Sequence, residues 1–247
     1  MDQADLFPIR LVRVDPGGLG SADATGYGEG EDGQIYALKT NDKHAHLPAI
    51  EWICSNIAHY CGIAVPPFRI LLSDNGHHYF GSRWEGGPLS RAQSQAALTE
   101  PDAVAGSQAV LPAIYVFDAF VHNVDRHIGN YLCRPAYGNT VVLAFDWSRA
   151  LFFHGWPLPD LPLPYKCNTL NTFAMLKKLR NTSWEWGIAE KVLNRLWKLS
   201  PAVIKHILEQ MPEPWLDNQL RQKFVAWWGS DLRIQRIDVI RQEIQNQ

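Results

Sequence analysis

Residues 116–132 read VFDAFVHNVDRHIGNYL, an apolar run that ends in a dense polar cluster. The cluster consists of Asp125, Arg126, His127 and Asn130. Polar side chains packed this closely beside an apolar segment destabilise a fold unless they find partners or serve chemistry. A further carboxylate, Asp146, follows at the end of the apolar segment 140–147 (TVVLAFDW). The spacing therefore predicts a candidate site at a loop and a nearby strand end.

The residue types at this site are those that phosphoryl transfer requires. In a D-x-x-x-x-N loop, Asp125 can accept or orient a hydroxyl proton while the amide oxygen of Asn130 reaches a metal ion. Asp146 supplies a carboxylate to the same metal. A positioned nucleophile and a Mg²⁺ ion that neutralises phosphate charge are the parts such a reaction needs. We therefore predict Asp125 as a catalytic residue, with Asn130 and Asp146 as Mg²⁺ ligands.

The other parts of a nucleotide site occur upstream in the expected order. Lys39 ends the alternating apolar segment QIYALK, which would present its ammonium group from a strand. Glu51, twelve residues further on, opens a predicted helix and could pair with that ammonium group. The glycine-rich segment from Gly17 to Gly33 precedes the lysine strand, where a flexible cover for phosphates belongs. No single one of these residues is decisive, but the occurrence of all of them in this order is improbable by chance.

Ordinary structural roles compete with each of these interpretations. Asp and Asn in a turn often satisfy their own backbone, and a lysine at a strand end usually faces solvent. Glu51 could simply favour the first turn of its helix through the macrodipole. The combination of Lys39 with Asp125, Asn130 and Asp146 favours a nucleotide site over these alternatives.

Hydrophobic periodicity predicts an α+β chain. Strands are expected at 9–14 and 34–40 with a mobile glycine-rich loop at 15–33 between them, a helix at 47–62, and two strands within 65–84. From about residue 89 the pattern is mostly helical, apart from the motif loop and a short strand at 140–147. We predict a two-lobed fold with an N-terminal lobe at 1–88, a helical C-terminal lobe at 89–247, and a cleft near residues 84 to 90.

Composition narrows the class of protein. The 247 residues carry 23 basic and 25 acidic side chains, a net charge of −2 that argues against binding to nucleic acid or anionic membranes through bulk charge. No segment approaches the roughly 18 apolar residues of a spanning helix, and the N-terminus does not resemble a signal peptide. The four cysteines form no C-x-x-C pair, and the histidine pairs lack matching ligands for zinc. We expect a soluble, cytoplasmic protein.

These motifs resemble a known family. HNVDRHIGN (122–130) followed by AFDWS (144–148) resembles the N-x-D-R-H-x-x-N and D-x-S/G signature of HipA-like kinases. DGQIYALKT, IEWICSNIAHYCGIAVPP and YFGSRWEGG extend the resemblance over about residues 15 to 155. The D-R-H-x-x-N loop is also similar to that of phosphatidylinositol 3/4-kinases, although the glycines alone would be weak evidence.

The resemblance implies a protein-kinase-like fold that uses ATP and Mg²⁺. It implies that Asp125 is the catalytic base-like residue, that Lys39 binds phosphate with Glu51 as its partner, and that Arg126 and His127 brace the loop. The backbone of Ser82, Arg83, Trp84 and Glu85 would form an adenine hinge. Family members also carry a modifiable serine on the glycine-rich loop, so Ser21 is the first candidate for nucleotide contact and autophosphorylation, with Thr25 the second.

By the same resemblance, the expected activity is transfer of the γ-phosphoryl group to a Ser or Thr hydroxyl of a protein, and the expected setting is a bacterial toxin–antitoxin or regulatory system. The substrate would be a translation factor or an aminoacyl-tRNA synthetase. Full-length HipA toxins carry a further N-terminal subdomain, whereas only about fourteen residues precede the glycine-rich loop here, so a separately encoded subdomain is a candidate partner. The resemblance also makes an antitoxin a candidate partner. A lipid or small-molecule kinase and an inactive nucleotide-binding scaffold remain as alternatives.

Overall fold

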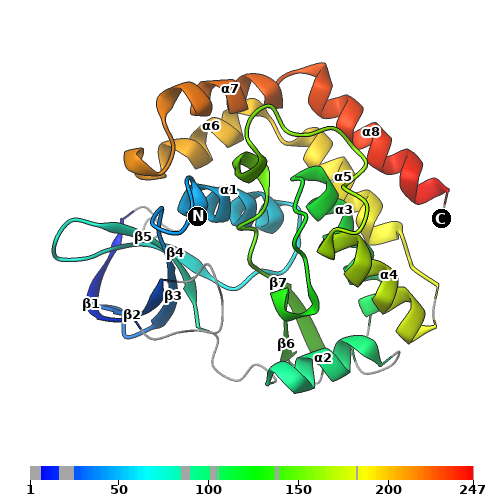
Figure 1. The fold of residues 1–247 in the computed structure, drawn as a ribbon, viewed down its shortest axis with the longest axis horizontal. Coiled ribbons are helices and arrows are strands. Elements are labelled where there is room, and N and C mark those ends of the chain that lie inside the picture. Colours follow the sequence, from blue (N-terminus) through cyan, green and yellow to red (C-terminus); the bar gives the residue numbers. More distant parts are fainter. Residues whose placement is uncertain are drawn as a thin grey trace.

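The computed structural model describes most of the chain, namely residues 7–16, 25–84, 90–100, 104, 106–136, 139–181 and 183–246. Strands predominate up to residue 84, and helices predominate from residue 91 onward. Figure 1 shows strands β1 to β5 grouped at the left of the molecule, with α6 and α7 along the top and α8 at the upper right. The prediction of a fold that mixes helices and strands is confirmed.

The N-terminal strands form a closed five-stranded barrel in the order β1–β2–β3–β5–β4. The strands are β1 (Ile9–Asp15), β2 (Gly26–Gly30), β3 (Ile35–Lys39), β4 (Phe68–Leu72) and β5 (His78–Arg83). Neighbouring strands are antiparallel except β1 and β4, which pair in parallel. Alternate side chains point inward, so the barrel interior is a small apolar core of Leu11, Tyr36, Leu38 and Leu71.

The glycine-rich segment is not a single mobile loop, and the prediction for 15–33 was wrong in this respect. Gly26–Gly30 forms β2 and pairs with both β1 and β3. A Cβ atom on Gly28 would lie 2.5 Å from Leu11 Cδ2 and 2.9 Å from Leu38 Cδ1. Glycine therefore serves close packing inside the barrel at this position, where the sequence pattern suggested flexibility. Residues 17–24 lie outside the described part of the chain.

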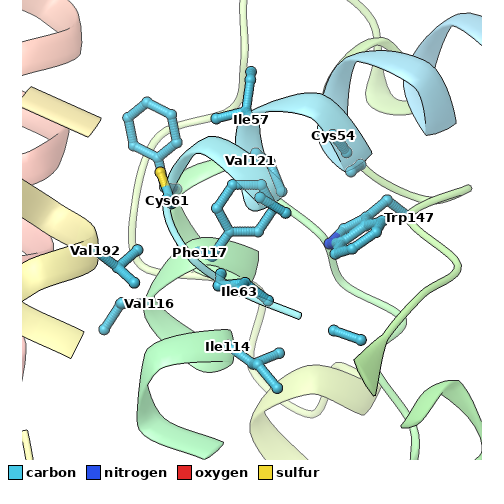
Figure 2. Packing of buried hydrophobic residues seen from close by; sticks show 14 of the residues in the cluster. Cys54, Ile57, Cys61, Ile63, Ile114, Val116, Phe117, Val121, Trp147 and Val192 are labelled. Carbon is cyan, nitrogen blue, oxygen red and sulfur yellow. The ribbon is translucent and has the colours of Figure 1, made fainter. Parts of the chain in front are cut away.

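Helix α1 (Leu47–Tyr60) lies between β3 and β4 in the chain and packs against the helical part. It ends as predicted beside Gly62, whose φ of 78° lies in the left-handed region that glycine tolerates. Its apolar face, including Cys54, Ile57 and Cys61, packs on Phe117 and Trp147 (Figure 2). Both cysteines are buried free thiols and belong to the core.

Two helices and a hairpin surround the motif loop. They are α2 (Arg91–Thr99), α3 (Ser107–Phe120), the short 3-10 turn η2 (Ile128–Asn130), β6 (Tyr131–Ala136) and β7 (Asn139–Ala144). The strand predicted at 140–147 corresponds to β7, which ends at Ala144, so Asp146 follows it in a loop. Strand β6 was not predicted, because Arg134 and Pro135 interrupt its apolar pattern. It pairs antiparallel with β7.

The C-terminal part is helical, as the sequence predicted. It contains η3 (Leu151–His154), α4 (Asn168–Arg180), α5 (Gly187–Lys198), α6 (Pro201–Glu209), η4 (Glu213–Trp215), α7 (Asn218–Trp228) and α8 (Asp231–Gln245). Ser200 caps α6 by accepting a hydrogen bond from Val203 N, and Pro201 occupies the first turn. Among the described residues, no helix combines the length and apolar character needed to span a membrane.

Trp228 of α7 is fully buried, and its indole N–H donates to Leu199 O at 2.8 Å. The indole therefore belongs to the core between α5 and α7.

Candidate active site

Three charged residues from distant parts of the sequence meet where the barrel contacts the helical part. Lys39 is the last residue of β3, Glu51 lies in α1, and Asp146 follows β7. The ammonium Nζ of Lys39 lies 2.7 Å from Glu51 Oε1 and 2.8 Å from Asp146 Oδ1. The side chains are only 8%, 2% and 12% exposed, respectively. Lys39 thus bridges two largely buried carboxylates, one of them 107 positions away.

Burial and mutual attraction set the charge states of this cluster. Burial opposes the charged form of Lys39, but Asp146 and Glu51 together raise its pKa above the ordinary value. Burial also opposes ionisation of Asp146, yet Lys39 holds the pKa of that carboxyl below its usual range. Burial raises the pKa of Glu51 to about 7 against the opposing effect of Lys39. Lys39 and Asp146 are therefore both charged at neutral pH.

The backbone of Asp146 is in an unusual conformation. Its φ of 62° lies in the left-handed region, where a non-glycine residue costs about 1 to 2 kcal/mol. Its Oδ1 also accepts a hydrogen bond from Ser148 N at 3.4 Å. Backbone strain of this kind concentrates at functional sites and persists only where surrounding contacts impose it. Here the contacts with Lys39 and Ser148 hold the carboxylate in place.

A buried guanidinium group connects the motif loop to the segment that carries Asp146. Arg126 is 1% exposed and donates from Nε and Nη2 to the carboxylate of Asp118 at 2.8 and 2.9 Å. Its Nη1 donates to Asn130 O at 2.9 Å and to Phe145 O. One side chain therefore fixes the position of both proposed metal-ligand segments.

Asp118, in α3, is the centre of this network, and sequence reasoning missed it. Besides Arg126 it accepts hydrogen bonds from Asn123 Nδ2 at 2.9 Å and Trp147 Nε1 at 3.1 Å. It is fully buried. The available signal was an acidic residue inside the apolar run YVFDAF, because a buried carboxylate requires a charged partner and Arg126 lies eight residues away.

Asp125 is half-buried and is held by contacts on its backbone and its side chain. Its backbone N–H donates to Asn123 Oδ1 at 3.2 Å, and its carbonyl accepts from Asn130 Nδ2 at 3.1 Å. Its carboxylate Oδ1 accepts from Asn168 Nδ2 at 2.5 Å. His127 shapes the following turn, since its Nδ1 accepts from Gly129 N at 3.1 Å. Asp125 and Asn130 thus lie on one rigid loop.

The residues predicted to contact adenine and to be modified on the glycine-rich loop are only partly described by the structure. Ser82 and Arg83 belong to β5, and the N–H groups of Arg83 and Trp84 already donate to Pro67 O and Ile35 O at 2.7 and 2.6 Å. These two donors are therefore engaged within the barrel and are not directed toward a ligand. Thr25 contacts Thr40 through the two hydroxyl oxygens at 3.3 Å. Ser21 and Glu85 lie outside the described residues.

One family model matches part of the chain. The family model of HipA-like kinases matches residues 27–143, which include Lys39, Glu51, Asp125 and Asn130 and stop just before Asp146. No curated protein matches the chain.

Two solved structures share the fold. A proinflammatory kinase of Helicobacter pylori, CtkA, is 14% identical over 95% of this chain and 97% of that chain, with a TM-score of 0.57. HipA of Shewanella oneidensis MR-1, solved with HipB and operator DNA as a toxin–antitoxin system, is 12% identical over 85% of this chain and 58% of that chain, with a TM-score of 0.50. At these identities the structures show similarity of fold alone.

The family match and the kinase folds together support a kinase. The resemblance noted in the motifs is thus confirmed, and residues 27–143 of this chain carry the sequence pattern of the HipA-like kinase family.

Proposed function

We propose that this protein is an ATP- and Mg²⁺-dependent kinase that transfers the γ-phosphoryl group to a Ser or Thr hydroxyl of a protein. The observation that carries the proposal is the contact of Lys39 with both Glu51 and Asp146. Phosphoryl transfer depends on a lysine for the phosphates and a carboxylate for the metal held in fixed relation. The barrel and the helical part would act as two lobes, at 1–88 and 89–247.

The residues present fit a nucleotide with Mg²⁺. Asp146 and Asn130 offer oxygen ligands, and Mg²⁺ in kinases uses one or two such side chains together with phosphate oxygens. The Nδ2 atom of Asn130 donates to Asp125 O, so the amide oxygen would be the atom that binds a metal ion. The ion, when bound, would neutralise charge on the phosphates. Lys39 would contact the phosphates while Glu51 keeps its ammonium group in place.

Asp125 would orient the acceptor hydroxyl and take up its proton. Its Oδ1 is engaged by Asn168, which leaves the second carboxylate oxygen for the hydroxyl. Arg126 would maintain the spacing of Asn130 and Asp146 through its bonds to Asn130 O and Phe145 O. His127 would support the same loop through Gly129.

Adenine binding and loop modification complete the proposal. Because the N–H groups of Arg83 and Trp84 are engaged, a hinge at Ser82–Glu85 would use the carbonyl groups or Glu85. We infer autophosphorylation at Ser21, with Thr25 as the second candidate. A phosphate there would add nearly two negative charges beside the predicted phosphate site and weaken ATP binding.

The biological setting follows by analogy with the fold relatives. HipA is described with an antitoxin and operator DNA, so an antitoxin or a separately encoded N-terminal subdomain is a candidate partner for this chain. We place the protein in the cytoplasm, with a translation factor or aminoacyl-tRNA synthetase as substrate. A lipid or small-molecule kinase and an inactive scaffold are the competing functions.

Thermal unfolding with nucleotide tests the proposal. ATP with Mg²⁺ at a hundred times the dissociation constant adds about 2.7 kcal/mol to the native state, or roughly 5 to 11 °C in Tm. Asp146→Asn should lose the Mg²⁺-dependent part of that shift, whereas the surface variant Asp238→Asn should keep it. Absence of a shift in wild type at millimolar ATP and Mg²⁺ would refute nucleotide binding.

A further inference from the structure

The first turn of α4 lies directly against the motif loop, although 43 positions separate Thr169 from Arg126. Thr169 is 2% exposed, and its hydroxyl accepts from Arg126 N at 3.0 Å and donates to Asn123 O at 2.6 Å. Its backbone N–H donates to Val124 O at 3.3 Å. The first N–H groups of a helix have no partner within the helix, so the loop supplies one. Thr169 therefore fixes α4 to the loop on both sides of Asp125.

The preceding residue makes a different kind of contact. Asn168 is the first residue of α4 and its side chain is exposed, yet its Nδ2 donates to Asp125 Oδ1 at 2.5 Å. Because Thr169 anchors the backbone beside it, the amide of Asn168 has little freedom to leave the carboxylate. The N-terminal end of a helix also carries a partial positive charge that favours a nearby carboxylate.

We propose that Asn168 is a positioning residue that holds the carboxylate of Asp125 in the orientation needed for phosphoryl transfer. The inference rests on the proposed function and adds to it a residue that acts through Asp125, from an element outside the motif loop.

The chemistry of an amide suits this task. An amide N–H occupies one carboxylate oxygen without carrying a charge or a titratable proton, so the other oxygen stays accessible to the acceptor hydroxyl. It also restricts rotation of the carboxylate. Misplacement of a reacting group by about 1 Å can cost about a hundredfold in rate. Loss of the Asn168 bond should therefore lower turnover while leaving nucleotide affinity unchanged.

If the bond between Asn168 and Asp125 were only structural, its loss would change stability and not turnover. A typical intramolecular hydrogen bond contributes about 0.5 to 1.5 kcal/mol to stability, and an exposed one contributes at the lower end. A structural role would thus show as a small loss of Tm with unchanged kcat. Asn171, three residues further along α4, provides the matched control. It is also exposed, and its Nδ2 donates to Lys166 O at 3.0 Å, away from Asp125.

The test compares Asn168→Ala, Asn168→Asp and Asn171→Ala with wild type in the full chain. Phosphoryl transfer from radiolabelled ATP is measured to the chain itself and to dephosphorylated casein, from pH 5 to pH 9. The Mg²⁺·ATP-dependent Tm shift of each variant is measured in parallel. We expect Asn168→Ala to lose about tenfold to a hundredfold in kcat with an unchanged ATP-dependent Tm shift. Asn171→Ala should match wild type.

Asn168→Asp gives a signature that a structural role would not produce. The substitution preserves the shape of the side chain but sets two carboxylates within hydrogen-bond distance, and such a pair tends to share one proton. At low pH the introduced carboxyl can donate its proton to Asp125 Oδ1 as the amide does. At high pH the two charges repel each other. The activity of Asn168→Asp relative to wild type should therefore rise as the pH falls.

The possible outcomes are distinct. Wild-type kcat in Asn168→Ala, or a ratio of Asn168→Asp to wild type that does not change with pH, would overturn the positioning role and leave the kinase proposal standing. An equal loss in Asn171→Ala would also overturn it, because the effect would then belong to α4 as a whole. Absence of transfer in wild type would refute the proposed function and the positioning role together.

Discussion

The buried pair of Asp118 and Arg126 gives the strongest prediction for stability. The carboxylate accepts bonds from Arg126 Nε and Nη2, Asn123 Nδ2 and Trp147 Nε1, and the two charged side chains are 0% and 1% exposed. Asp118→Asn keeps the volume but removes the charge and turns an NH₂ group toward these donors. An uncompensated guanidinium would remain in the core. Breaking a buried pair in this way costs about 3 to 5 kcal/mol.

The exposed pair of Arg241 and Asp238 is the matched control. Its Nη1 to Oδ1 distance of 2.9 Å is close to the buried one, but the side chains are 25% and 53% exposed. Solvent screening limits such pairs to about 0 to 1 kcal/mol. In urea unfolding, Asp118→Asn should therefore lose several times more free energy than Asp238→Asn, and its Tm should fall by roughly 6 to 20 °C. Losses equal within about 1 kcal/mol would refute the assignment of Asp118 as the centre of the loop network.

Two further predictions concern a histidine and a glycine. Burial, followed by the charges of Arg236 and His154, lowers the pKa of His122 to about 4. The neutral imidazole of His122 therefore contributes to stability above about pH 6.5, and this contribution is lost as the pH falls toward 4. His122→Asn tolerates the φ of 56° and should flatten this acid loss in urea unfolding, while the exposed-site control His59→Asn should not. Gly81→Ala would place a Cβ 2.4 Å from Leu71 Cδ1 and should lower the free energy of unfolding by about 1 to 3 kcal/mol. Gly187→Ala, where the space is open, is the control. A loss within about 0.5 kcal/mol of that control would contradict the barrel packing.

Local patterns predicted the elements whose periodicity is clear. The strands at β1 and β3, the β4–β5 pair, α1 and the C-terminal helices follow their apolar spacing. Strand β2 was missed because five residues of GYGEG carry almost no side-chain pattern. Only the tertiary contact of Gly28 with Leu11 and Leu38 explains why glycine occurs there.

The site shows the same division between local and long-range information. The D-x-x-x-x-N spacing and the order of Lys39 before Glu51 are visible in the sequence, and the structure brings Lys39, Glu51 and Asp146 into contact. The supports of the loop are not visible in this way. Asp118 lies within an apolar helix, and Asn168 begins a helix 43 positions from Asp125. Such partners depend on how elements pack, which a single sequence does not encode as a local pattern.

The substrate depends on the residues around the acceptor rather than on the fold. Relatives at 12% and 14% identity share an architecture, and architecture does not determine the acceptor. The residues that contact the acceptor will decide between a protein and a small molecule. The most informative experiment for the substrate is therefore transfer of labelled phosphate into cell lysate, with the labelled molecule and its site identified by mass spectrometry.

Separation of transfer from nucleotide binding tests the central claim most directly. Labelled phosphate transfer and ATP affinity are measured in wild type, Asp125→Asn and Lys39→Ala at the same pH and Mg²⁺ concentration. Removal of a general base typically costs about a hundredfold to ten-thousandfold in rate, so Asp125→Asn should lose transfer and keep near-wild-type ATP affinity. Lys39→Ala should lower turnover by disturbing the phosphates. Wild-type transfer in Asp125→Asn, or an equal loss of ATP binding in both variants, would contradict the assignment of Asp125 as the residue that faces the acceptor.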